Sequence, residues 1–208
     1  MPYVPTQFYA GNGTATTGDV VLYTVPAGMK AIVTDVTVGA LVDISYYLYP
    51  GPSFLCYSKY AGASQIQQYQ GFYVVEAGEN MITANFTSGA GYQVWSGLLG
   101  SGDVAGKTPA RLGTAAPTAG GDNVLVSGSP NGCIVKTILV QNVDPAPRAI
   151  ALRHNSAPIA PWGGAEVLGS YENRQYDYSL YVPPGSNILA NSMDGLAGAR
   201  FSAHGWRL

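Results

Sequence analysis

The sequence predicts an all-β protein built from two tandem β-sandwich or jelly-roll-like domains related by internal duplication. Its 208 residues include 27 Gly, 14 Pro and 15 Tyr but only 10 Lys and Arg together, a balance that favours short strands and tight turns over surface helices. No stretch keeps an apolar stripe of helical period over a dozen positions. The pattern of the first half also recurs in the second half, which predicts the duplication.

The duplication rests on five sequence blocks that match in the same order, at offsets of 102 to 107 residues. The pairs are TGDVVLY (17–23) with GGDNVLV (120–126), VPAG (25–28) with SPNG (129–132), IVTDVTV (32–38) with IVKTILV (134–140), VVEAGENMITAN (74–85) with YVPPGSNILANS (181–192), and WSG (95–97) with FSA (201–203). A unit of about a hundred residues that occurs twice must bury its own core each time.

The strands follow from alternating apolar and polar residues between Gly or Pro turns. In IVTDVTV, Val33 shares one face with Asp35 and Thr37, as in a strand with one side turned inward. The segment LYTVPAGMKAIVTDVTV (22–38) predicts a short strand, a Pro-Ala-Gly turn and a second strand, and we expect further strands at 44–49, 71–75, 80–86, 92–99, 149–154, 175–182 and 199–206. The segment most compatible with a short helix is SKYAGASQIQQYQ (58–70), which Gly62 interrupts.

A segment rich in Gly, Ala, Pro and Thr, residues 100–122, separates the two repeats and predicts the domain junction. We place an N-terminal arm and the first sandwich in residues 1–103, and a linker and the second sandwich in residues 104–208. The start, MPYVPTQFYAGNG, lacks the basic and apolar regions of a secretory signal and is expected to be that arm. Residues 2–8 mix aromatics with Pro, and we expect them to dock onto a neighbouring subunit.

Charge is scarce, at 11% of residues with a net charge of −2. No basic field is present to attract nucleic acid or an anionic membrane surface, and no segment is apolar enough for a membrane-spanning helix. Surfaces buried in obligate assemblies are depleted in Lys and Glu. We therefore expect a homo-oligomer of cyclic symmetry, such as a trimer, and neither nucleic acid nor a membrane span.

Residues that carry catalysis are equally scarce. His154 and His204 are the only histidines, and neither stands in a serine or cysteine motif. No GxSxG, HExxH, P-loop or CxxC pattern occurs. Glu76 and Glu79 flank a turn whose counterpart, PPGS, lacks both acids. We expect no catalytic residue, metal ligand or cofactor, hence no enzyme, and reduced thiols at Cys56 and Cys133.

Tyrosine is concentrated in the first domain, and strand alternation prevents these side chains from all facing one core. Exposed Tyr supplies contact area at low entropic cost and suits a protein interface or a sugar-stacking platform. The alternative is that several pack under loops with solvated hydroxyl groups. The interface residues we predict are Tyr3, Phe8, Tyr9, Tyr46, Tyr47, Tyr49, Tyr57, Tyr60, Trp95 and Trp162.

The hairpin VVLYTVPAGMKAIVTDVTV (20–38), followed by VVEAGENMITAN (74–85), resembles the small β-sandwich modules in virion structural proteins of tailed bacteriophages. The resemblance covers the first domain, while SPNG and PPGS depart from the pattern in the second. It implies a non-enzymatic virion component, made in the host cytoplasm, whose partners are other virion proteins and copies of itself.

The resemblance leaves three roles open. A minor tail protein is favoured, because the Tyr-rich first domain and the arm suit a tip- or fibre-associated subunit. A capsid decoration (cement) protein is the first alternative. The second is a carbohydrate-binding module that contacts a host surface glycan through Tyr47 or Trp95.

Overall fold

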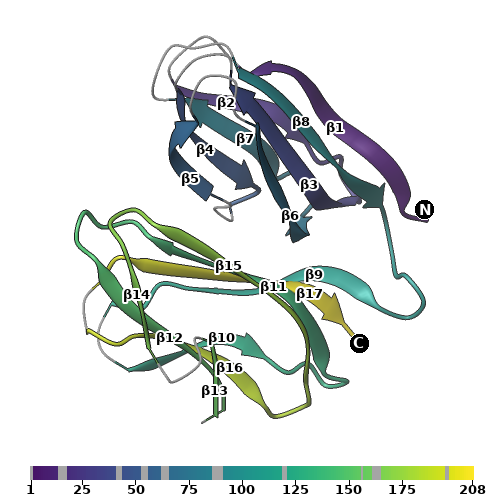
Figure 1. Cartoon of the computed structure of the whole chain (residues 1–208). Coiled ribbons are helices and arrows are strands. Elements are labelled where there is room, and N and C mark those ends of the chain that lie inside the picture. The colour runs from purple at the N-terminus through teal and green to yellow at the C-terminus, as the bar shows by residue number, and fades with distance from the viewer. Residues whose placement is uncertain are drawn as a thin grey trace. The chain divides into compact units, whose positions relative to one another are not determined.

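The computed structural model describes residues 2–13, 18–40, 44–52, 56–61, 66–85, 91–118, 121–155, 157–160, 165–194 and 197–208. The chain divides into two compact units, Met1–Ala105 and Gly106–Leu208. Strands dominate both units in Figure 1, which confirms the predicted all-β class. Within the described ranges no helix is long and apolar enough to cross a membrane.

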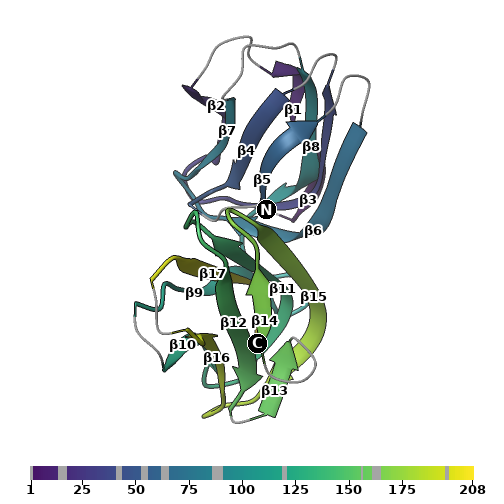
Figure 2. The same cartoon turned by 60° about the vertical axis from the view of Figure 1, so that its left-hand side comes forward.

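The first unit is a sandwich of two antiparallel sheets, with strand orders β1-β8-β3-β6 and β2-β7-β4-β5. Figures 1 and 2 show the sheets as two layers, and residues such as Val36, Leu48 and Val75 are buried between them. The strands are β1 (Val4–Gly13), β2 (Gly18–Thr24), β3 (Lys30–Ala40), β4 (Ile44–Pro50), β5 (Cys56–Ala61), β6 (Ile66–Val75), β7 (Asn80–Asn85) and β8 (Gly91–Gly100).

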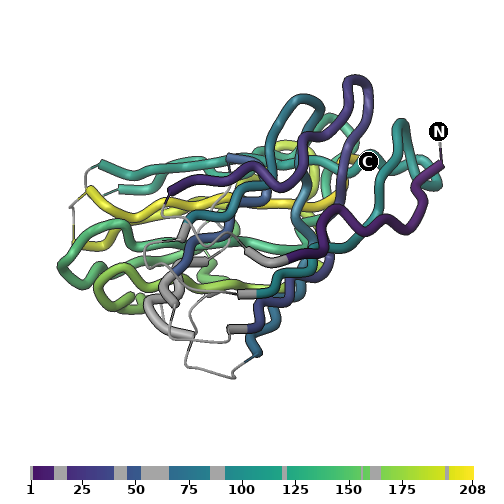
Figure 3. The backbone as a smooth tube through the Cα atoms, turned by 90° about the horizontal axis from the view of Figure 1, so that it is seen from above, coloured from purple at the N-terminus to yellow at the C-terminus, as the bar shows by residue number. Residues whose placement is uncertain are grey.

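The second unit repeats this topology, with orders β9-β17-β11-β15 and β10-β16-β12-β13 and with β14 also paired to β12. Strands β9 to β12 thus match β1 to β4, and β15 to β17 match β6 to β8; Figure 3 traces each unit from strand to strand. The predicted duplication of a sandwich is confirmed. The strands are β9 (Thr108–Ala115), β10 (Asp122–Ser127), β11 (Cys133–Asn142), β12 (Arg148–His154), β13 (Ala157–Ala160), β14 (Glu166–Leu168), β15 (Asn173–Val182), β16 (Asn187–Ser192) and β17 (Ala199–Arg207).

The two units also share their irregularities. The register shifts at Leu22 in β2 and at Leu125 in β10, and again at Thr34 in β3 and at Lys136 in β11. A β-bulge inserts one residue and turns its neighbours onto the same face. The turns match as well, since Gly78 and Gly185 follow β6 and β15 with φ of 80° and 76°, in the left-handed region that favours glycine.

The strand register, counted from the bulges of β3 and β11, corrects the last of the five block matches. Trp95 pairs with Val36, two residues beyond the β3 bulge, whereas Ala203 pairs with Ile138, two residues beyond the β11 bulge. Trp95 therefore corresponds to Ala203, and the predicted match of WSG with FSA is displaced by two residues. A slip of two leaves every side chain on the same face of a strand, so sequence periodicity could not reveal it.

The N-terminal segment is a strand of the first sandwich rather than an arm. β1 pairs with β8 from Val4 opposite Leu99 to Gly13 opposite Gly91. Sequence reasoning missed it because Pro interrupts the pattern, yet Pro is tolerated on an edge strand, where one row of backbone groups needs no partner. The segment considered for a helix, 58–70, contributes to β5 and β6 in its described parts.

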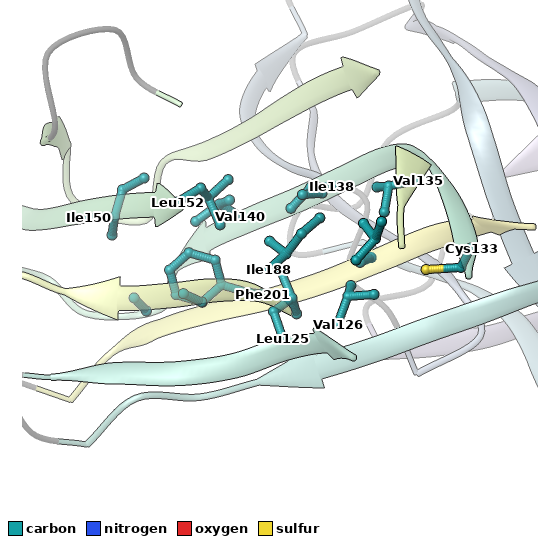
Figure 4. Packing of buried hydrophobic residues seen from close by; sticks show 14 of the residues in the cluster. Leu125, Val126, Cys133, Val135, Ile138, Val140, Ile150, Leu152, Ile188 and Phe201 are labelled. Carbon is teal, nitrogen blue, oxygen red and sulfur yellow. The ribbon is translucent and has the colours of Figure 1, made fainter. Parts of the chain in front are cut away.

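Each unit buries a core of its own. Figure 4 shows the second core, an apolar cluster in which the adjacent residues Leu125 and Val126 both point inward from the β10 bulge. In the first unit Trp95 Nε1 donates to Gln93 Oε1 at 3.1 Å, and Gln93 Nε2 donates to Thr83 Oγ1 at 2.9 Å. The indole N–H and both ends of the Gln93 amide thus find partners inside the unit, as buried polar groups require.

Candidate interaction surface

Three of the predicted interface residues lie inside the first unit. Phe8 is 6% exposed, and Tyr46 and Trp95 are fully buried. They face inward from β1, β4 and β8, so they offer no contact area to a partner in this fold, and the prediction is corrected for them. The Tyr46 hydroxyl donates to Gln67 Oε1 and lies 2.9 Å from the Tyr69 hydroxyl, which explains how its polar end is buried.

Tyr3 and Tyr9 are half-buried along the N-terminal strand, and their rings cover glycines of their own unit. A Cβ on Gly100 would lie 2.8 Å from Tyr3 Cγ, and one on Gly11 would lie 2.9 Å from the Tyr9 hydroxyl. Burial, followed by the charges of Glu76 and Asp103, raises the pKa of Tyr3. Both residues remain predicted contacts of limited area.

Three predicted residues cannot be placed by their side chains. Tyr57 and Tyr60 lie on β5, where the described structure extends to the backbone only, and Trp162 lies outside the described residues. Their roles stay predictions.

Tyr47 and Tyr49 lie on the outer face of the sheet β2-β7-β4-β5, because the alternate residues Tyr46 and Leu48 face the core. Their ring centroids are 6.0 Å apart and the ring planes are inclined by 46°. Tyr49 pairs with Ile82, which in turn pairs with Val21, a side chain 52% exposed. An apolar row thus crosses three strands.

We name Val21, Tyr47, Tyr49 and Ile82 the tyrosine face. Sequence reasoning identified its two tyrosines but missed Val21 and Ile82. The paired valines at 20–21 carry a weak signal, since one of them must turn outward. The order in which β2, β7 and β4 pair is a long-range property that no local pattern contains.

In the second unit the surface that corresponds to the tyrosine face carries different side chains. Val124, 51% exposed, corresponds to Val21, and its neighbour Leu189 pairs with Arg153, which stands at the position of Tyr49. The Arg153 guanidinium lies 3.1 Å from Asp122 Oδ1. An exposed ion pair thus replaces the tyrosine, and an aromatic outer row is a property of the first unit.

The two histidines lie apart, on different sheets. His204 is buried on β17 with Nε2 3.3 Å from Ser202 Oγ; burial, and secondly the charge of Arg111, lower its pKa to about 3. His154 is half-buried at the end of β12. Across the described residues, no three His, Cys, Asp or Glu side chains gather in a way that could hold a metal ion.

The remaining charges of the second unit tie strands together. Arg174 on β15 lies 2.5 Å from Glu166 Oε1 on β14 and also pairs with Glu172, while the Tyr176 hydroxyl donates to Glu166. Burial, and then this hydrogen bond, raise the pKa of Tyr176. Cys133 is a free thiol at one end of the core, and burial raises its pKa; the Cys56 side chain is not among those described.

Comparison with known proteins gives no family. No family model and no curated protein matches the chain. Among solved structures it is similar to the major capsid protein P2 of bacteriophage PM2, with a TM-score of 0.40 and 7% identity over 99% of this chain and 97% of that one. It is also similar to allantoicase from Saccharomyces cerevisiae, with a TM-score of 0.27 and 9% identity over 86% of this chain and 74% of that one. Both TM-scores lie below 0.5, a range in which a likeness implies neither a shared family nor a shared function.

Proposed function

We propose that the chain is a non-enzymatic structural protein of a bacteriophage virion and that it assembles through the tyrosine face of its first unit. The observation that carries the proposal is the contrast between equivalent positions of the duplicated fold. The second unit places an Arg153–Asp122 ion pair where the first places Tyr49 beside the exposed Val21. Val21 is exposed and Tyr47, Tyr49 and Ile82 are partly exposed, so a partner that covers the row removes this apolar surface from water and explains why one copy keeps it.

Two further observations support the proposal. Charged residues make up 11% of the chain, as expected of a surface largely covered by neighbours. The VPAG hairpin and the segment after it resemble virion β-sandwich modules, as described above. The partners we propose are other virion proteins and further copies of this chain.

Within the particle we propose the tail, as a minor tail protein, with capsid decoration as the alternative. The Tyr-rich first unit supports a tip- or fibre-associated place. The N-terminal segment does not support such a place, because β1 is a strand of the first sandwich. Immunogold labelling of purified particles distinguishes the two locations.

The test replaces Tyr49 by Arg in the phage that carries the gene. The second unit shows that Arg is compatible with this position, since Arg153 pairs there with Asp122, and Asp19 is the counterpart of Asp122 in the first unit. We expect Tyr49→Arg to yield a folded protein that is depleted from particles. The matched control is Val167→Lys, which changes a side chain 63% exposed on the second unit and should leave incorporation intact.

Particles are compared by quantitative mass spectrometry and the purified variants by thermal melting. Absence of the wild-type protein from particles overturns the proposal, and full incorporation of Tyr49→Arg overturns the role of the tyrosine face. Saturable oligosaccharide binding that is lost in Tyr47→Ala, by a protein absent from particles, assigns a carbohydrate-binding module instead. Trp95 cannot serve in that test, because it is buried and its replacement perturbs the fold.

A further inference from the structure

A groove of about 440 Å³ lies along one side of the second unit, in the seam between the edge strands β9 and β10. Its floor is apolar, with Leu125 and Cys133 at 2% and 1% exposure. Polar groups and one cation stand at its rim. The lining residues are Leu112, Val124, Leu125, Ser127, Gly128, Ser129, Pro130, Cys133 and Arg207.

The duplication shows what fills the same seam in the first unit. Phe8 is the residue skipped by the register shift between β1 and β8, and Leu112 is the residue skipped between β9 and β17. The Phe8 ring packs against Tyr23 with centroids 5.2 Å apart and is 6% exposed. Leu112 and Val126 hold the corresponding positions in the second unit, so the seam there lacks both rings.

The groove is preformed. Gly128 N–H donates to Ser186 O at 2.9 Å, and the Ser129 hydroxyl donates to Gly132 O within the turn that ends β10. These bonds fix the turn that carries Pro130. A site whose walls are already ordered loses little conformational entropy on binding.

The charge at the rim selects the ligand. Arg207 pairs across the sheet with Cys133, and its exposed side chain lines the mouth of the groove. Its counterpart in the first unit is Leu99, opposite Ala31. Of these two equivalent positions, only the one in the second unit carries a cation. A guanidinium beside an apolar slot favours a ligand that joins a ring to a carboxylate.

We propose that this groove binds an aromatic side chain next to a carboxylate on a partner polypeptide, with the ring in the place that Phe8 takes in the first unit and the carboxylate on Arg207. That the partner is another virion protein rests on the proposed function. The binding chemistry does not.

The first experiment titrates the purified full chain with 8-anilinonaphthalene-1-sulfonate, which joins aromatic rings to an anion. We expect fluorescence to report one saturable site. Leu112→Phe copies the first unit and should raise the melting temperature and weaken binding by at least about tenfold, because the ring fills the slot. Arg207→Gln should weaken binding by about three- to tenfold without lowering the melting temperature, since only the ion pair is lost.

The reciprocal change supplies the matched control. Phe8→Leu and Tyr23→Val combined with Leu99→Arg copy the groove into the first unit, and the number of probe molecules bound should rise from one to two. Unchanged binding by Leu112→Phe, or an unchanged stoichiometry in the folded triple variant, overturns the proposal.

The second experiment displaces the probe with capped peptides of sequence Gly-Phe-Asp-Gly and Gly-Phe-Lys-Gly. We expect the acidic peptide to compete more strongly, and its advantage to disappear in Arg207→Gln. Displacement by neither peptide indicates a site for small molecules alone and overturns the polypeptide partner. All these readouts use the isolated chain, so their failure leaves the particle test of the proposed function untouched.

Discussion

Gly97 and Gly205 hold one structural position in the two units, and each permits a close approach of backbone to backbone. Gly97 lies opposite Val33 and Gly205 opposite Val135, directly before the bulges of β3 and β11. A Cβ at Gly97 would lie 1.9 Å from Ile32 O, and one at Gly205 would lie 2.0 Å from the carbonyl oxygen of Ile134. No side chain fits at either place without a backbone shift.

We therefore expect Gly97→Ala and Gly205→Ala each to destabilise the fold by about 3 kcal/mol or more. Urea unfolding followed by tryptophan fluorescence measures the change. The matched control is Gly39→Ala in the same sheet as Gly97, where the nearest backbone atom would be 3.9 Å away. Equal stability of Gly97→Ala and Gly39→Ala would contradict the close approach.

His204 predicts how acid affects stability. Burial lowers its pKa to about 3 in the folded chain, whereas an unfolded chain has the ordinary value of about 6.5. The unfolded state therefore binds more protons below pH 6.5, and stability falls as the pH drops from about 6.5 toward 3. His204→Gln should flatten this slope, which unfolding curves at pH 7 and pH 4.5 measure against the wild type.

His154→Gln is the control for that slope, since His154 is half-buried at the end of a strand. Acidic side chains contribute their own loss of stability at low pH in all three proteins, so the difference between variants carries the information. An identical pH dependence of wild type and His204→Gln would show that the imidazole takes no part.

At the scale of strands, β6 and β15 show a compensated exchange of aromatic side chains. The register of β6 against β3 skips residues 71 and 72, and the register of β15 against β11 skips residues 178 and 179. Gly71 of β6 therefore corresponds to Tyr178 of β15, and Tyr73 corresponds to Leu180. A Cβ on Gly71 would lie 2.4 Å from Cζ of Tyr73, whose hydroxyl donates to Gln70 O at 3.1 Å. In the second unit the ring belongs to Tyr178, at the position of Gly71, and Leu180 stands at the position of Tyr73. Burial raises the pKa of Tyr178 to about 12.

The exchange predicts strong coupling between the two positions of β6. Gly71→Tyr alone should cost about 3 kcal/mol through overpacking, and Tyr73→Leu alone should cost about 2 kcal/mol through the cavity that it leaves. The double variant should be more stable than the sum by about 1–3 kcal/mol. Chemical denaturation of all four proteins measures the cycle, and simple additivity would show that the rings fill separate spaces.

β1 shows which elements local patterns can predict. The hairpins around VPAG and EAGE were predicted because their turn residues and alternation lie within one short segment. β1 was missed because Pro5 hides the alternation and because Phe8 enters the core through a bulge. Of the tyrosine face, alternation identified Tyr47 and Tyr49 as residues of one face, but strand pairing supplied Val21 and Ile82.

The corrected role of β1 predicts the effect of removing it. Deletion of residues 1–10 takes away most of an edge strand and the buried Phe8 ring, which alone is worth about 3–5 kcal/mol. We expect calorimetry to show a transition of the first unit at much lower temperature and an unchanged transition of the second. An unchanged first transition would support a dispensable arm instead.

At the scale of the whole chain, duplication has allowed two copies of one fold to diverge in what they expose. The first copy carries an aromatic outer row and a seam closed by Phe8, and the second carries an ion pair on that face and an open seam. Both copies keep the bulges of their second and third strands, the turn glycines Gly78 and Gly185 and the close-approach glycines Gly97 and Gly205, because these features determine the strand pairing. Surface positions and seam-filling side chains are free to differ, and both proposed partner sites lie there.

This division of roles requires each copy to fold by its own core. The apolar cluster of the second unit draws all its members from residues 125 to 203, within Gly106–Leu208. Residues 106–208 expressed alone should therefore give a dispersed amide NMR spectrum and a cooperative thermal transition, since a domain of this size can bury enough apolar surface to fold. Gly205→Ala in the same fragment is the negative control and should lose both properties. A disordered wild-type fragment would mean that the second copy needs the first in order to fold, and the two surfaces could then not have diverged independently.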